Sequence, residues 1–160
     1  MLCTNVQADN TAYSFKKVAE LGGQAPNGGV HINDFEPGAL NNRGDVIYGT
    51  DLGTSSDSAT FFGEGVFLRR AGYKSELELA RGTGNASGGG VFDFLLLGQT
   101  QVNDWGDAAF AFTLTPFGSP VGVNSGVYRY SRATRNVTAV VVPGVTPAPG
   151  GGVFAGRTST

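Results

Sequence analysis

Two short segments of the chain carry oxygen-bearing side chains at close spacing, which is the side-chain chemistry that binds calcium. The recurring residues of these segments are Asn41, Gly44, Asp45, Asn103, Gly106 and Asp107. Calcium takes about six to eight oxygen ligands, usually from several acidic residues at alternating positions. Each segment provides only two or three. We therefore predict structural turns and no metal site: the asparagine braces the turn, the glycine takes a positive φ, and the aspartate caps free amides.

The other chemically competent residues do not form a recognisable catalytic pattern. His31 is the only histidine, and no Gly-x-Ser-x-Gly segment accompanies it. Its counterpart in the repeat described below is Phe92, so we expect a packing or rim position for it. Glu76 and Glu78 share one face of a predicted strand that we expect to be solvated, and exposed carboxylates make a poor acid–base pair. The sequence therefore predicts a protein that is not an enzyme.

Cofactor and zinc sites are also disfavoured. The chain has one histidine and one cysteine, too few for zinc ligation. The glycine triplets at 88–90 and 150–152 precede Val-Phe strands rather than helices and contain no lysine, unlike a phosphate-binding loop. We expect no cofactor.

Composition excludes several classes of partner. Of the 160 residues, 15% are charged, the net charge is −2, and the basic residues are dispersed, so we expect no nucleic-acid surface. The longest apolar runs are too short to cross a bilayer, so we expect no membrane span. Glycine occurs 26 times among aromatic residues, which is typical of many turns between short strands.

A repeat of about 62 residues organises the chain. The matched pairs of segments are 40–48 with 102–110, 65–67 with 126–128, and 88–92 with 150–154. An earlier copy of the last match lies at 28–30. We predict a single repeat domain over 1–160, divided into a partial unit 1–30, repeat one 31–91, repeat two 92–153 and a partial tail 154–160.

The periodicity within a repeat predicts strands. Large and small apolar residues alternate through 108–114, a period of two that fits a strand packed between sheets. Further strand-like runs are 65–70, 126–131, 92–97 and the three related runs 14–22, 75–82 and 137–144. About four short strands per repeat predict an all-β fold of antiparallel, propeller-blade-like repeats. A two-sheet β-sandwich with the repeats as its halves is the alternative, and a β-solenoid is a further rival.

The order Asn-x-x-Gly-Asp-x-x-aromatic, Gly-Val-aromatic, Gly-Gly-Gly-Val-Phe resembles a propeller-like β-repeat family of exported bacterial proteins of unknown function. The resemblance covers roughly residues 28–154. Ala108-Ala109-Phe110 fits the family's small apolar pair before the aromatic residue, whereas Val46-Ile47-Tyr48 fits it less well. The resemblance implies a fold and export to the cell surface or medium, and it implies no catalytic residue. Relatives with this pattern typically hold more than two repeats.

The expected function follows from the partial repeat units at both ends of the chain. Open strand edges are templates for pairing with another chain, so we expect a homo-oligomer formed through these edges and the terminal segments. The expected function is that of a non-catalytic, self-assembling structural protein, secreted or on the cell surface, whose subunits complete each other's sheets in a ring or a filament. The alternatives are a propeller-type module that binds carbohydrate or protein, and a fragment of a longer propeller.

Overall fold

The structure is a computed structural model that describes residues 16–96, 99–115 and 124–154. The described part contains nine strands and one short 3-10 helix, Ser58–Thr60. The strands are β1 Val30–Leu40, β2 Val46–Gly53, β3 Phe61–Arg69, β4 Glu76–Arg81, β5 Val91–Leu95, β6 Gln101–Val102, β7 Ala108–Thr115, β8 Asn124–Ser131 and β9 Asn136–Val141. No helix in these three stretches is long and apolar enough to cross a membrane.

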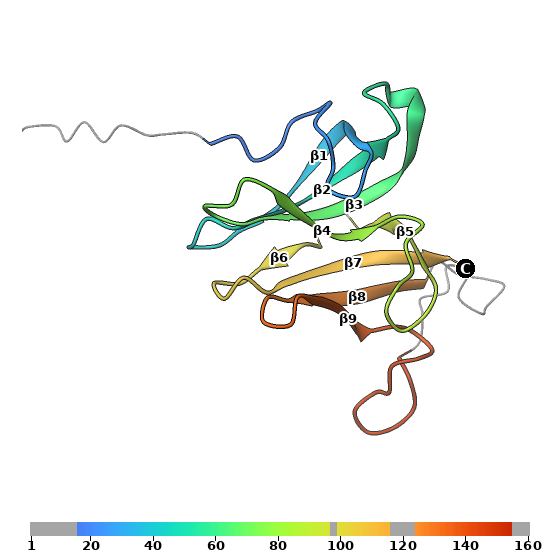
Figure 1. The fold of residues 1–160 in the computed structure, drawn as a ribbon. Coiled ribbons are helices and arrows are strands. Elements are labelled where there is room, and N and C mark those ends of the chain that lie inside the picture. Colours follow the sequence, from blue (N-terminus) through green and yellow to red (C-terminus); the bar gives the residue numbers. More distant parts are fainter. Residues whose placement is uncertain (1–15, 97–98, 116–123, 155–160) are drawn as a thin grey trace, which may run out of the picture.

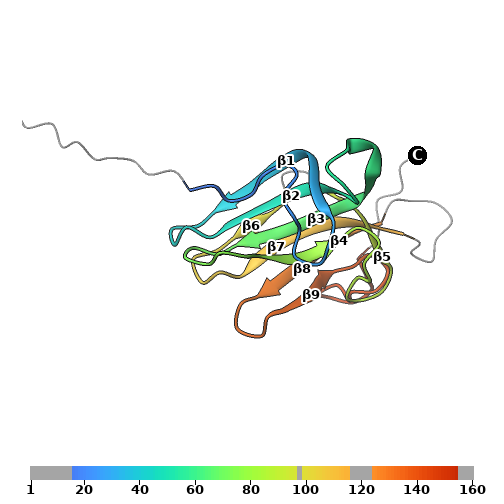
Figure 2. The same cartoon turned by 45° about the horizontal axis from the view of Figure 1, so that its top comes forward.

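The strands form two antiparallel sheets that lie one against the other (Figures 1 and 2). The first sheet has the order β1-β2-β3-β4, and the second has the order β5-β7-β8-β9 with β6 paired to β7. The predicted all-β, antiparallel fold is confirmed. Two facing sheets agree with the β-sandwich alternative and do not contradict the blade-like interpretation. The predicted repeat boundaries stay predictions, and the terminal units extend into 1–15 and 155–160, outside the described residues.

Each sheet has a front face, which we define by a stacked pair of aromatic rings on its two central strands. Tyr48 and Phe67 form the pair in the first sheet, with ring centroids 5.7 Å apart and an interplanar angle of 25°. Phe110 and Tyr128 form it in the second sheet, at 5.8 Å and 24°. Such ring pairs fix how the two strands pack, because offset stacking restricts both side chains.

A third ring meets each stacked pair edge-on from the first strand of the sheet. His31 lies 5.0 Å from Phe67 at 84°, and Phe92 lies 4.8 Å from Tyr128 at 75°. The two front faces therefore carry the same arrangement of three rings, one of which is an imidazole in the first sheet.

The two sheets pack front to back. The back face of the first sheet presents Ile47, Val66 and Leu68, all with 0% exposure, and these side chains share one hydrophobic core with the front face of the second sheet. The front face of the first sheet belongs to a separate, smaller cluster. The back of the first sheet meets the front of the second sheet. The front of the first sheet and the back of the second sheet are therefore the two outer faces.

The two outer faces of the pair of sheets differ in how far they are covered. Residues 16–29 lie across the front face of the first sheet, where Val18, Ala19 and Ala25 contact its aromatic cluster. On the back face of the second sheet, Val127 is 40% exposed and Val140 is 48% exposed. The front end is thus partly covered by the chain itself, and the back end carries exposed apolar side chains.

Two expectations from the sequence differ from the structure. The run 14–22 was expected to resemble a strand, but residues 16–20 have no regular secondary structure, and residues 14 and 15 lie outside the described part. The face bearing Glu76 and Glu78 was expected to be solvated, but their side chains are 10% and 9% exposed. The reason is that β4 lies at a sheet edge beside the N-terminal segment, whose residues reach over that face.

The close approach of the two sheets predicts a sensitive glycine. A Cβ at Gly49, on the back of β2, would lie 2.2 Å from Cδ2 of Leu95 in the second sheet. Gly49→Ala should lower the free energy of unfolding by about 1–3 kcal/mol, as measured by urea denaturation, because Leu95 is 5% exposed and has no open space to enter. Ala109→Val, on the half-buried back face of the second sheet, should change it by less than about 0.5 kcal/mol. Equal effects of the two substitutions would contradict front-to-back packing.

Candidate functional site

The segment between β1 and β2 is held by its own asparagine and aspartate. Oδ1 of Asn41 accepts hydrogen bonds from the backbone N–H groups of Arg43 (3.0 Å) and Asp45 (2.8 Å). Gly44 has a φ of +83°, which a glycine adopts without steric cost. Oδ1 of Asp45 accepts from the N–H of Ala71, in the next turn of the sheet, at 2.9 Å. These bonds tie the β1–β2 connection to the β3–β4 connection.

The segment between β6 and β7 has the same contacts. Oδ1 of Asn103 accepts from the N–H groups of Trp105 (3.0 Å) and Asp107 (2.9 Å), and Gly106 has a φ of +84°. Oδ1 of Asp107 accepts from the N–H of Arg132 at 2.8 Å. The six residues singled out in the sequence therefore lie in two segments with equivalent hydrogen bonds.

The two segments also bind each other across the gap between the sheets. Nδ2 of Asn41 donates to the carbonyl of Asn103 at 2.7 Å. The backbone N–H and Nδ2 of Asn42 donate to the two carboxylate oxygens of Asp104 at 2.9 and 2.8 Å. The first segment donates in all three bonds, so the contact has a direction.

The aspartates of these segments hold their charge through hydrogen bonds. Burial raises the pKa of Asp45, but the bonds from Asn41 and from the Ala71 N–H outweigh it and leave the pKa below its usual value. The Arg129 side chain lowers the pKa of Asp107. In the described ranges, no group of three or more His, Cys, Asp or Glu side chains is placed to hold a metal ion.

A buried polar cluster lies on the front face of the first sheet. Nε2 of His31 is 2.8 Å from Oε1 of Glu76, and the hydroxyl of Tyr48 donates to Oε2 of the same carboxylate. His31 and Tyr48 are 1% and 5% exposed. Glu78, the next residue along this face, pairs instead with Arg81 at 2.6 Å. The two carboxylates expected in solvent are therefore both engaged by neighbouring side chains.

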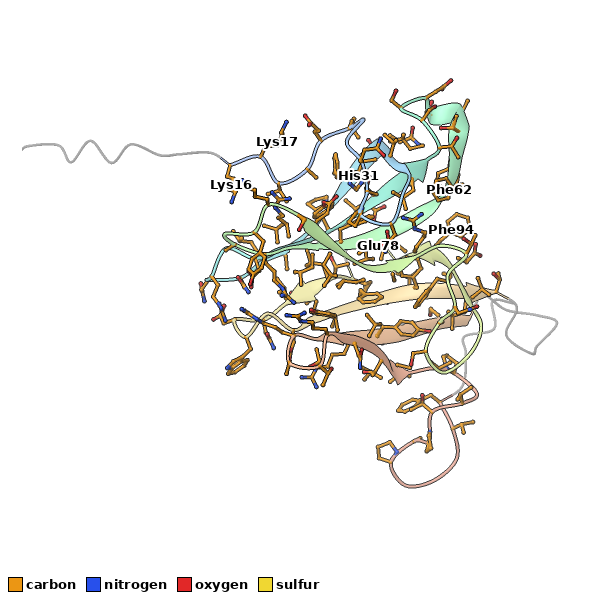
Figure 3. The ribbon with its side chains drawn as sticks, viewed as in Figure 1. Lys16, Lys17, His31, Phe62, Glu78 and Phe94 are labelled. Atoms are coloured by element: carbon orange, nitrogen blue, oxygen red, sulfur yellow. The ribbon has the colours of Figure 1, made fainter. Side chains whose placement is uncertain are left out.

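The N-terminal segment crosses this face and leaves a cavity on each side of it. Lys17, Val18 and Ala19 line both cavities. One cavity, of about 250 Å³, is polar and is also lined by Glu20, Gly23, Gln24, His31, Arg69 and Glu76. The other, of about 240 Å³, is apolar and is also lined by Phe35, Val46 and Tyr48. Figure 3 places Lys17 and His31 on this side of the molecule.

The polar cavity is lined by charged and polar side chains. Its described lining contains no serine, threonine or cysteine, and its titratable residues are Lys17, Glu20, His31, Arg69 and Glu76. The Glu76 carboxylate already accepts one bond at each oxygen, and Nδ1 of His31 is buried without a hydrogen-bond partner in the described structure. The arrangement is suited to holding side chains or a small polar molecule in place.

Sequence reasoning did not find this cluster. Phe92, Phe110 and Val137 lie 61 or 62 positions after His31, Tyr48 and Glu76, so the matching positions of the second sheet are apolar. The match of His31 with Phe92 predicted a packing position and could not show that His31 meets Tyr48 and Glu76.

A second group of carboxylates lies beside the contact between the sheets. Oε2 of Glu64 accepts from the N–H of Leu95 at 2.5 Å, which joins β3 to β5. Burial raises the pKa of Glu64, and it also raises the pKa of Glu36, with a further contribution from the Glu64 charge. Because the folded-state pKa values of both carboxyl groups are raised, ionising them opposes folding. The free energy of unfolding therefore falls as the pH rises through these pKa values.

Comparison with known proteins identifies a family without assigning an activity. A family model described as a family of unknown function (DUF7453) matches residues 4–159 of the chain, and the protein belongs to that family. No curated protein and no solved structure matches the chain.

The turn contacts generate a pH-dependent prediction. Asp45→Ala should lower the free energy of unfolding at pH 7 by about 1–3 kcal/mol, because it leaves the N–H of Ala71 and Nδ2 of Asn41 without their acceptor. The folded-state pKa of Asp45 is depressed, so its contribution is complete above the unfolded-state value and is lost as the pH falls through the folded one. Urea denaturation at several pH values measures this, and Asp34→Ala, at an exposed position, is the control. A pH-independent difference would refute the role of the charge.

The polar cluster generates a second prediction. Tyr48→Phe should cost about 1–2 kcal/mol in unfolding free energy, because it leaves one oxygen of buried Glu76 without a donor. The combined change His31→Phe, Tyr48→Phe and Glu76→Val installs the set found in the second sheet. We expect that variant to unfold within about 1 kcal/mol of the wild type in urea, since an apolar set can replace a buried polar one. A triple variant that is much less stable than Tyr48→Phe would show that the fold itself needs the polar set.

Proposed function

We propose that the protein is a non-catalytic, self-assembling structural protein whose sheets act as blade-like units and stack front to back between copies as they do within one. The observation that carries this proposal is the unequal burial of equivalent residues on the two back faces. Val66 in the first sheet is 0% exposed, whereas Val127, 61 positions later, is 40% exposed. Leu79 and Val140, also 61 positions apart, are 8% and 48% exposed.

The occupant that fits the exposed back face is a front face of the same kind. Within the chain, the back face of the first sheet is covered by the three-ring front face of the second. The first sheet carries the same ring arrangement on its own front. A second copy of the chain therefore offers a complement to Val127 and Val140. The same face also carries Arg129 and Thr138, 61 positions after Leu68 and Leu77, so the interface would include these polar residues as well.

The turn contacts support the same direction of assembly. Asn41 and Asn42 of the first sheet donate to Asn103 and Asp104 of the second. At the end of the stack, Trp105 is 76% exposed beside these residues. The indole of Trp105 is thus accessible to another copy, whereas the Asn103 carbonyl and the Asp104 carboxylate are already bonded within the chain.

Head-to-tail contacts between copies close into a ring if the rotation per copy allows it, and otherwise build a filament. The resemblance of the repeat to exported bacterial proteins supports a secreted or cell-surface location. Dispersed charge and the absence of a basic stripe in the sequence support protein rather than nucleic acid as the partner.

A binding module is the second candidate function. The polar cavity beside His31, Arg69 and Glu76 has a volume of about 250 Å³, enough for a small polar molecule such as a sugar unit. In this case the front face of the first sheet serves a ligand, and the second sheet serves as its support.

Assembly is tested by multi-angle light scattering over a dilution series. The wild type should form oligomers whose mass falls on dilution. Val127→Lys should remain monomeric, because a lysine on the back face of the second sheet would be buried without a partner at the interface. Leu40→Lys is the matched control, since Leu40 is 69% exposed and lies at the end of β1. A wild type that is monomeric at every concentration would contradict the proposal.

A further inference from the structure

One hairpin loop occurs three times in the chain, and we name its copies loop A (22–31), loop B (83–92) and loop C (144–154). In each, the first residue donates its N–H to the carbonyl of the last. These bonds are Gly22 to His31 at 2.8 Å, Thr83 to Phe92 at 2.6 Å, and Gly144 to Phe154 at 2.7 Å. In each, an alanine inside the loop also donates to a glycine near its end, at 3.0 Å; the pairs are Ala25 with Gly29, Ala86 with Gly90, and Ala148 with Gly152.

Loops A and B each cover a front face. Ala25 of loop A is 5% exposed in the cluster of the first sheet, and Ala86 of loop B is 8% exposed in the core shared with the second sheet. Loop C has no sheet of the described chain to cover. Figure 1 shows it extending from β9 away from both sheets, and Val145 and Val153 in it are 45% and 53% exposed.

The segments that lead into the loops are equivalent as well. Val18, Leu79 and Val140 stand at matching positions before loops A, B and C. Val18 contacts the front cluster of the first sheet, and Leu79 is buried in the core between the sheets. Val140 is the exposed member of the three. Residues 16–29 and 138–152 are therefore two copies of one covering element, and only the first has a front face to cover.

Both copies of this element cannot occupy one front face. When sheets stack front to back between two copies of the chain, β9 and loop C of one copy must take the place that residues 16–29 of the other copy already hold. We infer that assembly proceeds by exchange: segment 138–152 of one copy replaces segment 16–29 on the first sheet of the next. This inference rests on the proposed self-assembly. It adds that segment 16–29, which we call the cover, must leave the first sheet before another copy can bind there.

Residues 16–29 bind the front face less extensively than residues 138–152 would, as an exchange requires. The cover begins with Lys16 and Lys17, whereas the matching positions of β9 are Thr138 and Ala139. The cover has no regular secondary structure and leaves a cavity on each side of it. By contrast, β9 is paired to β8, so it would bring a whole sheet onto the face. The neighbouring strands of that sheet would close the apolar cavity that Phe35, Val46 and Tyr48 now line.

The attachment of the cover consists of a few hydrogen bonds and apolar contacts. Gly22 and Gly23 exchange two backbone hydrogen bonds with His31 of β1, at 2.8 and 2.9 Å. Arg81 donates to the carbonyl of Gly28 at 2.7 Å, and Gly29 lies against the ring of Phe62. Gly151 of loop C is the counterpart of Gly28, because both donate their N–H to the loop alanine. Arg81 could therefore form its bond with either loop, and exchange would not leave it unpaired.

The first test compares hydrogen exchange in the assembled wild type and in monomeric Val127→Lys, with both chains full length. On assembly, the amides of Gly22 and Ala25 in loop A should lose protection, while those of Gly144 and Ala148 in loop C should gain it. An assembly in which loop A keeps its protection would overturn the exchange and leave front-to-back assembly intact. A wild type that never assembles would remove both proposals together.

The second test places the same substitution at two equivalent positions. Val18→Asp weakens the cover, so it should lower the concentration at which the chain assembles by about fivefold. Val140→Asp weakens the incoming element, so it should raise that concentration by at least the same factor. Circular dichroism and urea denaturation check that both variants keep the fold. Assembly weakened by Val18→Asp, or unaffected by Val140→Asp, would refute the exchange.

Discussion

The structure depends on the need to cover the apolar faces of its sheets. Three of the four faces are apolar: the two front faces carry aromatic rings, and the back of the first sheet carries Ile47, Val66 and Leu68. The back of the second sheet mixes Val127 and Val140 with the exposed polar residues Arg129 and Thr138. A sheet with two apolar faces is stable only between two other layers. Front-to-back packing meets this need once within the chain, and any finite stack leaves two faces to be covered by other means.

The differences between the two sheets follow from what covers their front faces. A whole sheet covers the front of the second sheet, and there the three positions are Phe92, Phe110 and Val137. Only a narrow segment covers the front of the first sheet, so cavities of about 250 and 240 Å³ remain beside it. His31 and Glu76 line the polar cavity and Tyr48 lines the apolar one. The hydrogen bonds among these three side chains satisfy their polar groups on this face.

Local patterns in the sequence predicted the elements that local chemistry determines. Alternation through 108–114 predicted β7, and the related runs predicted β3, β8 and β9 within a few residues of their observed ends. The burial of Glu76 and Glu78 could not be predicted from alternation, because it depends on residues 16–29 lying across that face. For the same reason the cluster at His31 escaped notice, since its members come from β1, β2 and β4 and meet only after the sheet has formed.

The polarity of the stack comes from hydrogen bonds rather than from the apolar faces. Burial of apolar surface is non-directional and would tolerate packing of two back faces against each other. Between segments 41–45 and 103–107, however, the donors lie on one side and the acceptors on the other. Both carboxylate oxygens of Asp104 accept from Asn42 of the same chain, so these bonds fix which side of each sheet faces the other within one chain. Hydrogen bonding at the turns therefore sets the order of the two sheets within the chain, which the apolar faces alone would leave undetermined.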